Sequence, residues 1–209
     1  MRRGTEFSIM SGTIELMNSR LGASEEALAT IACGKIRDRP GARILIGGLG
    51  MGFTLRAALA TLAADARVVM AELVPEVIAW GLGPLAPVFG ESLQDPRVDL
   101  READVGRLIG GDKLTYDAIL LDVDNGPEGL TRRANDSLYS AAGLRAAHSA
   151  LRPGGVLAVW SSGQNPAFTR RLLAASFAVD EVKVRANGDR GGARHIIWIA
   201  TKAPSPASR

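Results

Sequence analysis

A cluster of glycines directly follows a short apolar run and is the first candidate for a ligand-binding site. Residues 44–46 are apolar, glycines follow at 47, 48, 50 and 52, and apolar residues then recur at helical spacing. Glycine lacks the Cβ that would hold a ligand away, and it adopts positive φ where a chain reverses. The amides at the start of the following helix are free to bind a ligand at the same place. The pattern predicts a strand, a tight turn and a helix that bind a cofactor through Gly47, Gly48, Leu49, Gly50 and Gly52.

Two other interpretations of the glycine cluster were weighed. The dinucleotide fingerprint Gly-x-Gly-x-x-Gly is absent, because Phe53 stands three residues after Gly50 and Leu55 three after Gly52. A glycine-rich turn that serves only close helix packing is the structural alternative.

Acidic residues follow the next predicted strands. Glu72 lies 20 residues after Gly52, about the spacing at which an acid binds ribose hydroxyls in βαβ nucleotide sites. Asp104 and Asp122 end the two strands after that. Because ligands of open parallel sheets bind beyond the carboxyl ends of the strands, three such acids indicate one ligand site more than chance surface positions. Leu73 and Val105 flank two of these acids and are further candidates for cofactor contact.

Asp122 and Asp124 are the candidate catalytic residues. A carboxylate at the end of a strand can accept a proton from an attacking amine, which contributes about 10² to 10⁴ in rate. The same two acids could instead neutralise a cationic substrate, or bind loop amides in an Asx turn. These alternatives stay open.

Composition and charge limit the other function classes. The chain has 209 residues, 46% of them hydrophobic, which is enough for one substantial core. Its net charge is only +3. Positive charge gathers only at 185–194 and at Arg132–Arg133, so we expect no nucleic-acid partner. No apolar window is long enough to span a membrane, and we expect a soluble, cytoplasmic protein.

The cysteine and the two histidines predict no further chemistry, and we expect no metal site. A single cysteine, Cys33, excludes an internal disulfide and a cysteine-based metal site. The strand before Ser161 and Ser162 ends without an acid, so we expect no metal. His148 and His195 have no triad partners nearby in the sequence, and we expect both to be structural.

The elements that position these residues alternate along the chain. Strands are expected at 44–46, 67–73, 97–101, 116–121 and 156–160, with helices between them, and an antiparallel hairpin at 179–184 and 195–200. Repeated βα units predict an α/β, doubly wound, mostly parallel sheet. A small hairpin is expected at 5–17, and a helix capped by Ser24 should run to about Ile36. Other helices are expected at 75–85 and 137–151. We divide the chain into 1–40, a nucleotide-binding domain at 41–202, and a disordered tail at 203–209.

With these residues laid out, the chain resembles spermidine synthase-like members of the class I S-adenosylmethionine-dependent transferases. The resemblance covers about 11–198 and rests on the segments 46–52, 71–78, 116–128 and 151–157, the last being a fold signature only. It implies the Rossmann-like class I methyltransferase fold with seven strands, and S-adenosylmethionine or its decarboxylated form as cofactor. It implies that Glu72 binds ribose, that Asp104 contacts adenine and that Asp122 contacts the attacking amine. A small amino-terminal sheet and possible homodimerisation belong to the same expectation.

Two departures from the family bear on the reaction. Polyamine-making members carry an aspartate at the place of Gly50, and an Asp-Glu-x-x-Tyr-His-Glu stretch that here resembles residues 24–30 and keeps only Glu25. A doubly charged diamine needs such groups to replace its lost water. We therefore expect a small amine-bearing acceptor, with methyl transfer favoured over aminopropyl transfer. Alternatives are a polyamine aminopropyltransferase and a non-catalytic nucleoside-binding protein.

Overall fold

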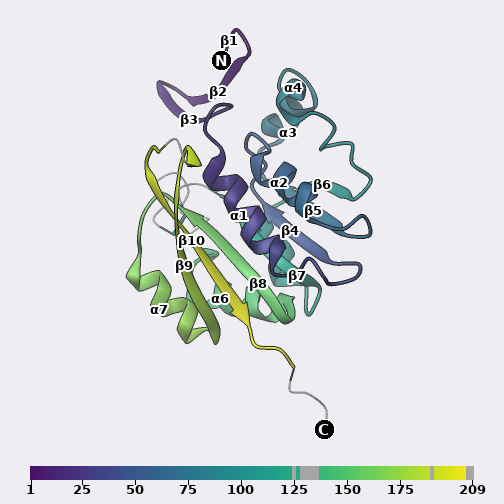
Figure 1. Cartoon of the computed structure of the whole chain (residues 1–209), viewed down its shortest axis with the longest axis vertical. Helices are drawn as coiled ribbons and strands as arrows, with labels where there is room; N and C mark the ends of the chain where they lie inside the picture. The colour runs from purple at the N-terminus through teal and green to yellow at the C-terminus, as the bar shows by residue number, and fades with distance from the viewer. Residues whose placement is uncertain (124–125, 128–136, 189–190, 206–209) are drawn as a thin grey trace.

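A computed structural model describes residues 1–123, 126–127, 137–188 and 191–205. Its centre is a seven-stranded sheet in the order β6-β5-β4-β7-β8-β10-β9 (Figure 1). Five of the strands are parallel, and β10 pairs antiparallel with both β8 and β9. The strands are β4 (Arg43–Gly47), β5 (Arg67–Glu72), β6 (Val98–Glu102), β7 (Tyr116–Leu121), β8 (Leu151–Ser161), β9 (Phe177–Arg185) and β10 (Arg194–Lys202).

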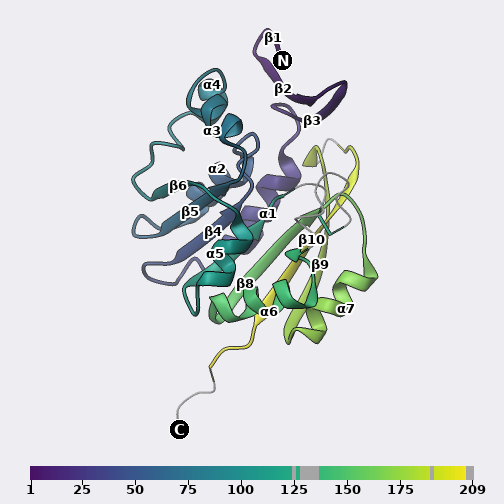
Figure 2. The same ribbon diagram turned by 180° about the vertical axis from the view of Figure 1, so that it is seen from behind.

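Helices cover both faces of this sheet. On one face lie α1 (Ala23–Gly34) and α2 (Phe53–Thr61), and on the other lie α5 (Val105–Gly111), α6 (Ala141–Ala150) and α7 (Pro166–Ala174), as Figures 1 and 2 show from opposite sides. Each face has its own apolar core, with Ile44, Ile46 and Leu120 in the first and Leu45, Ile119 and Leu121 in the second. The alternation of adjacent strand residues between two cores explains why β4 and β7 are apolar throughout. The predicted doubly wound α/β fold is confirmed.

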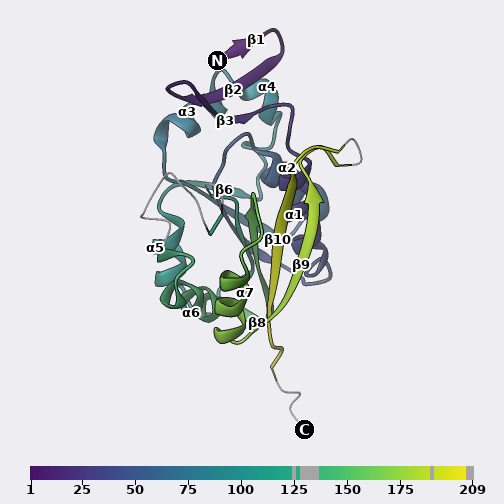
Figure 3. The ribbon, with the colours of Figure 1, turned by 90° about the vertical axis from the view of Figure 1, so that its left-hand side faces the viewer.

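A small antiparallel sheet lies beyond the carboxyl ends of the parallel strands. It contains β1 (Arg2–Arg3), β2 (Glu6–Ser11) and β3 (Ile14–Asn18), and Figure 3 shows it above the main sheet, near α3 (Pro75–Leu82) and α4 (Ala86–Phe89). The hairpin expected at 5–17 is therefore present. It brings Met17 against the glycine loop, because a Cβ built on Gly50 would lie 3.2 Å from Met17 Sδ.

A buried carboxylate ties the amino ends of the strands together. Asp117 of β7 is 2% exposed and accepts hydrogen bonds from Arg39 Nη1 at 2.8 Å, Arg152 Nη1 at 2.8 Å and the Arg43 amide at 2.9 Å. Its side chain thus links the segment before β4 with β7 and β8, and it stands at the edge of the sheet opposite the glycine loop.

Several predicted boundaries differ from the structure. The cap of α1 is Gly22 and not Ser24, because the helix begins two residues earlier than expected and Ser24 lies inside its first turn, fully buried. The helix expected at 75–85 ends at Leu82, and a separate α4 follows. The helix expected at 137–151 begins at Ala141, because Ser140 caps it through a bond from the Gly143 amide, and Leu151 already belongs to β8. The division at residue 40 stays a prediction, and residues 206–209 of the tail lie outside the described part.

Candidate functional site

The glycine loop has the geometry that its composition predicted. Gly48, Gly50 and Gly52 have φ of +92°, +49° and +74°. A Cβ on Gly48 would lie 2.1 Å from the carbonyl oxygen of Asp122, so this position admits no side chain at all. The Gly48 amide donates to Ala71 O at 2.9 Å, and Gly52 directly precedes α2. The loop therefore contacts the ends of both neighbouring strands, β5 and β7.

Glu72, the last residue of β5, accepts hydrogen bonds from backbone amides of this loop and of the segment after β5. Its Oε2 accepts a hydrogen bond from the Leu49 amide at 2.9 Å, and its Oε1 accepts one from the Val74 amide at 2.8 Å. The side chain is only 8% exposed. Each carboxylate oxygen keeps a second lone pair, so the same group can both hold the loop and accept a ribose hydroxyl. Leu73 beside it is 43% exposed and presents apolar surface.

Asp104 lies at the end of the neighbouring strand. It caps α5, with Oδ1 accepting from the Gly106 amide at 2.8 Å, and the Ala103 amide before it donates to the Glu72 carbonyl at 2.9 Å. Val105 is buried against the loop, because a Cβ on Gly47 would lie 2.8 Å from Val105 Cγ2. The structure therefore brings the glycine loop, Glu72 and Asp104 to one edge of the sheet, and their part in binding stays a prediction.

Asp122 stands on the other side of the loop, in an acidic environment. Its Oδ2 accepts a hydrogen bond from Thr54 Oγ1 of α2 at 2.5 Å. Burial and then the negative charge of Glu25 raise the pKa of Asp122 to about 7, while the bond from Thr54 opposes this shift. Burial also raises the pKa of Glu25. Like charges that are poorly hydrated do not both ionise easily, so this pair holds a proton near neutral pH. Asp124, the second predicted catalytic residue, lies outside the described residues.

Sequence reasoning did not assemble the groups that surround Asp122 on this side. Ser24 Oγ donates to Glu25 Oε2 at 2.5 Å, and His195 Nδ1 lies 2.9 Å from Ser24 Oγ. The rings of Trp160 and His195 pack edge to face with centroids 4.7 Å apart. Only Glu25 carried a signal, through its match to the acidic stretch of the polyamine-making enzymes.

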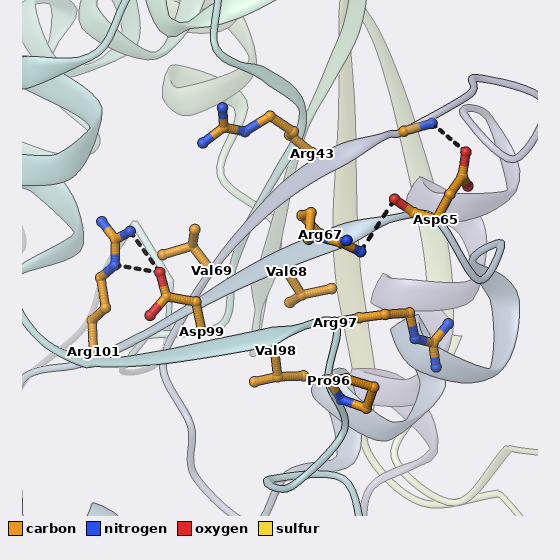
Figure 4. Close-up of a pocket in the computed structure, with 11 residues that line it drawn as sticks. Arg43, Asp65, Arg67, Val68, Val69, Pro96, Arg97, Val98, Asp99 and Arg101 are labelled. Atoms are coloured by element: carbon orange, nitrogen blue, oxygen red, sulfur yellow. Dashed lines mark hydrogen bonds and ion pairs between the residues drawn. The ribbon is translucent and has the colours of Figure 1, made fainter.

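A separate hollow lies at the opposite end of the same strands. It has a volume of about 390 Å³ and is lined by Arg43, Arg67, Arg97, Arg101, Asp65 and Asp99, among others (Figure 4). Arg101 is paired with Asp99 at 2.6 Å, and Arg97 with Asp95 at 2.8 Å, so half of these arginines are already neutralised. Because Arg43 and Arg67 begin β4 and β5, this hollow is remote from the glycine loop, which follows the end of β4.

The described residues show neither a metal-ligand cluster nor a membrane-spanning helix. These residues contain no group of three or more metal-ligating side chains. Within the same ranges, none of the helices is long and apolar enough to cross a bilayer.

Comparison with known proteins places this geometry in context. No protein-family model matches the chain. It is 35% identical over 126 residues to Polyamine aminopropyltransferase 2 of Pseudomonas aeruginosa, an alignment that covers 58% of this chain and 34% of the relative. The chain thus spans about a third of the length of the curated relatives that it matches.

Two solved structures share its fold. A spermidine synthase in complex with the transition-state analogue AdoDATO matches with a TM-score of 0.70 and 20% identity, covering 93% of this chain and 64% of that one. The 1,6-didemethyltoxoflavin-N1-methyltransferase of Burkholderia thailandensis, with bound S-adenosylhomocysteine, matches with a TM-score of 0.58 and 23% identity, covering 87% of this chain and 79% of that one.

The protein therefore has the fold of the class I S-adenosylmethionine-dependent methyltransferases. Over part of its length its sequence is similar to polyamine aminopropyltransferases, and its fold is similar to that of a spermidine synthase.

Proposed function

We propose that this protein transfers an alkyl group from an S-adenosylmethionine-type sulfonium to an amine, with aminopropyl transfer from the decarboxylated cofactor as the leading reaction. The observation that carries the proposal is the contact between the glycine loop and Asp122. Gly48 approaches the Asp122 backbone closely enough to exclude a Cβ, so a nucleoside over the loop has the acidic pair of Asp122 and Glu25 at its side.

The nucleoside end would bind through the loop and the acids of neighbouring strands. The amides of Gly50 and Met51 and the amino end of α2 would supply hydrogen-bond donors, since the amides of Gly48, Leu49 and Gly52 already donate within the protein. Glu72 accepts from ribose, and Asp104 and Val105 flank the base together with the exposed side chain of Leu73. These residues fit an adenosine group because they combine a floor without Cβ atoms, two carboxylates and apolar surface. The bound cofactor supplies an electrophilic carbon attached to a positively charged sulfur.

The acceptor end would bind beside Asp122. The lone pair of the amine forms the new C–N bond as the C–S bond breaks, and the C–S electron pair stays on sulfur as a neutral thioether. The amine proton passes to Asp122, whose pKa of about 7 matches a base that works near neutral pH. Glu25 adds negative charge that offsets the lost hydration of a cationic acceptor. Holding both reactants in line removes much of the entropic cost of the encounter.

Methyl transfer is the second candidate, and one observation favours it. At Gly50 the loop has no acid, and Met17 occupies the space beyond it, with Sδ 3.2 Å from a Cβ built there. The carboxylate of intact S-adenosylmethionine therefore meets no opposing acid at this position, in contrast to the pattern of polyamine-making members. The curated relatives are named polyamine aminopropyltransferases, which supports the aminopropyl reaction.

The released nucleoside identifies the reaction. The protein would be incubated with each form of the cofactor and a panel of mono-, di- and polyamines, and the products analysed by mass spectrometry. Methylthioadenosine with an aminopropylated acceptor supports the leading proposal, whereas S-adenosylhomocysteine with a methylated acceptor supports the second. Calorimetric binding of either cofactor without product from any amine favours a non-catalytic nucleoside-binding protein.

A further inference from the structure

A hydrogen-bonded chain extends from the acidic pair across the sheet to β10. Ser24 is fully buried, and its hydroxyl stands between Glu25 Oε2 at 2.5 Å and His195 Nδ1 at 2.9 Å. His195 is held from the side by the ring of Trp160. These hydrogen bonds join residues 171 positions apart in the sequence, and the reaction proposed above does not involve His195.

Because Ser24 has a single hydroxyl proton, the protonation states of Glu25 and His195 depend on each other. A serine hydroxyl has one proton to donate and two lone pairs to accept with. When Ser24 donates to an ionised Glu25, it has no proton left for His195, so the ring must donate from Nδ1. When Glu25 is protonated and donates to Ser24, the hydroxyl is free to donate to an unprotonated Nδ1. An ionised Glu25 therefore goes with an Nδ1 that carries a hydrogen, either in the neutral Nδ1–H tautomer or in the imidazolium ion, and the positive charge of the imidazolium ion stabilises the ionised Glu25 further.

Among the described residues, the strand partner of His195 carries no charge. On β9 the residue opposite it is Val184, and Lys183 and Arg185 occupy the alternate positions that point to the other face. On α1, Glu26 is exposed and interacts with Arg56 of α2, and Glu25 interacts with Asp122, which directly follows β7. Burial lowers the pKa of His195 and raises that of Glu25, which brings the proton affinities of the two ends closer together.

We propose that His195 is a positioning residue of the acceptor site: through Ser24 it orients the Glu25 carboxylate, and its protonation favours the ionised form of Glu25 that binds a cationic amine. The charge of Glu25 adds to the effect of burial in raising the proton affinity of Asp122, so His195 links the acceptor site to external pH. The kinetic part of this inference depends on the proposed transferase function, whereas the linkage between His195 and Glu25 does not.

The linkage can be measured without any activity. The full chain has two histidines, so an NMR pH titration of the imidazole nitrogens resolves His195 beside His148 as an internal control. Glu25→Gln removes the charge at the end of the chain, and Ser24→Ala removes the bridge. We expect the pKa of His195 to fall by about half a unit or more in each variant, and that of His148 to stay constant. A His195 pKa that stays the same in both variants overturns the inference.

Kinetics separate positioning from a purely structural role. His195→Asn keeps a donor near the place of Nδ1 but cannot titrate, whereas His195→Leu keeps bulk and has no donor. We expect His195→Leu to raise the KM for the amine about five- to tenfold at constant KM for the sulfonium, and His195→Asn to restore the amine KM and weaken its pH dependence. An unchanged amine KM in His195→Leu contradicts the positioning role. If neither wild type nor variant turns over any amine, the proposed function fails and the NMR titration alone decides the linkage.

Discussion

Thr54 Oγ1 donates a hydrogen bond of 2.5 Å to Oδ2 of Asp122, and this bond joins the first turn of α2 to the carboxyl end of β7. In the described part of the chain no hydrogen bond to Oδ1 of this carboxylate is seen, so we expect Oδ1 to meet the acceptor. Since α2 begins directly after the glycine loop, the bond also ties the position of the candidate base to the loop that would hold the cofactor.

Asp122→Asn should lower turnover and leave the cofactor bound. Asparagine keeps the shape of the side chain and cannot take up the amine proton, so we expect kcat to fall about 10²- to 10⁴-fold. Calorimetry with the active form of the cofactor should show an unchanged Kd. Asp180→Asn, an exposed site that pairs with Lys35, is the control. Full activity in Asp122→Asn would remove this residue from the mechanism.

The carboxyl group of Asp122 should also make both the stability and kcat of the protein depend on pH. Its pKa is raised from 3.8 to about 7, so the folded protein binds more protons than the unfolded chain between these values. Stability from this group is therefore complete below about pH 4 and declines as pH rises through about 7, whereas kcat rises over the upper part of that range as the base ionises. Denaturant unfolding at several pH values should show this slope in wild type and a weaker one in Asp122→Asn. An equal slope in both would assign the effect to other groups.

Gly48→Ala should disrupt the cofactor loop. At φ of +92° the new Cβ would lie 2.1 Å from the Asp122 carbonyl oxygen, so β7 or the loop must move. Backbone strain of this kind costs about 1–3 kcal/mol, before the cost of the clash. We expect loss of calorimetric cofactor binding and a lower melting temperature. Gly163→Ala, where a Cβ meets nothing within 4 Å, should behave as wild type.

Asp117→Ala should destabilise the fold with no direct effect on the site. The substitution leaves Arg39, Arg152 and the Arg43 amide without their shared acceptor, and loss of one partner from a buried ion pair costs about 3–5 kcal/mol. The arginine side chains are partly exposed, so we expect the lower end of this range in urea unfolding. Asp99→Ala removes an exposed pair with Arg101 and should cost less than about 1 kcal/mol. A similar loss of unfolding free energy in both variants would contradict the idea that burial makes the Asp117 interactions stronger than the exposed Asp99 pair.

Much of the site could be predicted because its parts are encoded locally. Gly48, Gly50 and Gly52 need positive φ, and glycine is the residue that adopts it without strain. Glu72, Asp104 and Asp122 follow successive parallel strands, whose carboxyl ends meet at one edge by the rules of the fold. Asn165 is likewise a local signal: it directly precedes Pro166 and caps α7, since its side chain accepts from the Phe168 amide.

The acceptor side could not be predicted, because no local pattern marks it. Ser24 looked like a helix cap, yet the hydroxyl faces the sheet and bonds Glu25 and His195. His195 was expected to be structural because its sequence neighbours include no partner. It reaches the site because β10 runs antiparallel between β8 and β9, which places the first residues of β10 at the edge where the parallel strands end.

The amino-acid sequence by itself determined the order of strands and helices, the cofactor loop and the acids at the strand ends, since these depend on periodicity and on residue types close together in the chain. Only the tertiary structure decided that Thr54 and Glu25 lie near Asp122 and that His195 reaches Glu25 through Ser24. Contacts between residues so far apart depend on how the sheet is ordered and how α1 packs on it, and neither leaves a repeating signal in the sequence.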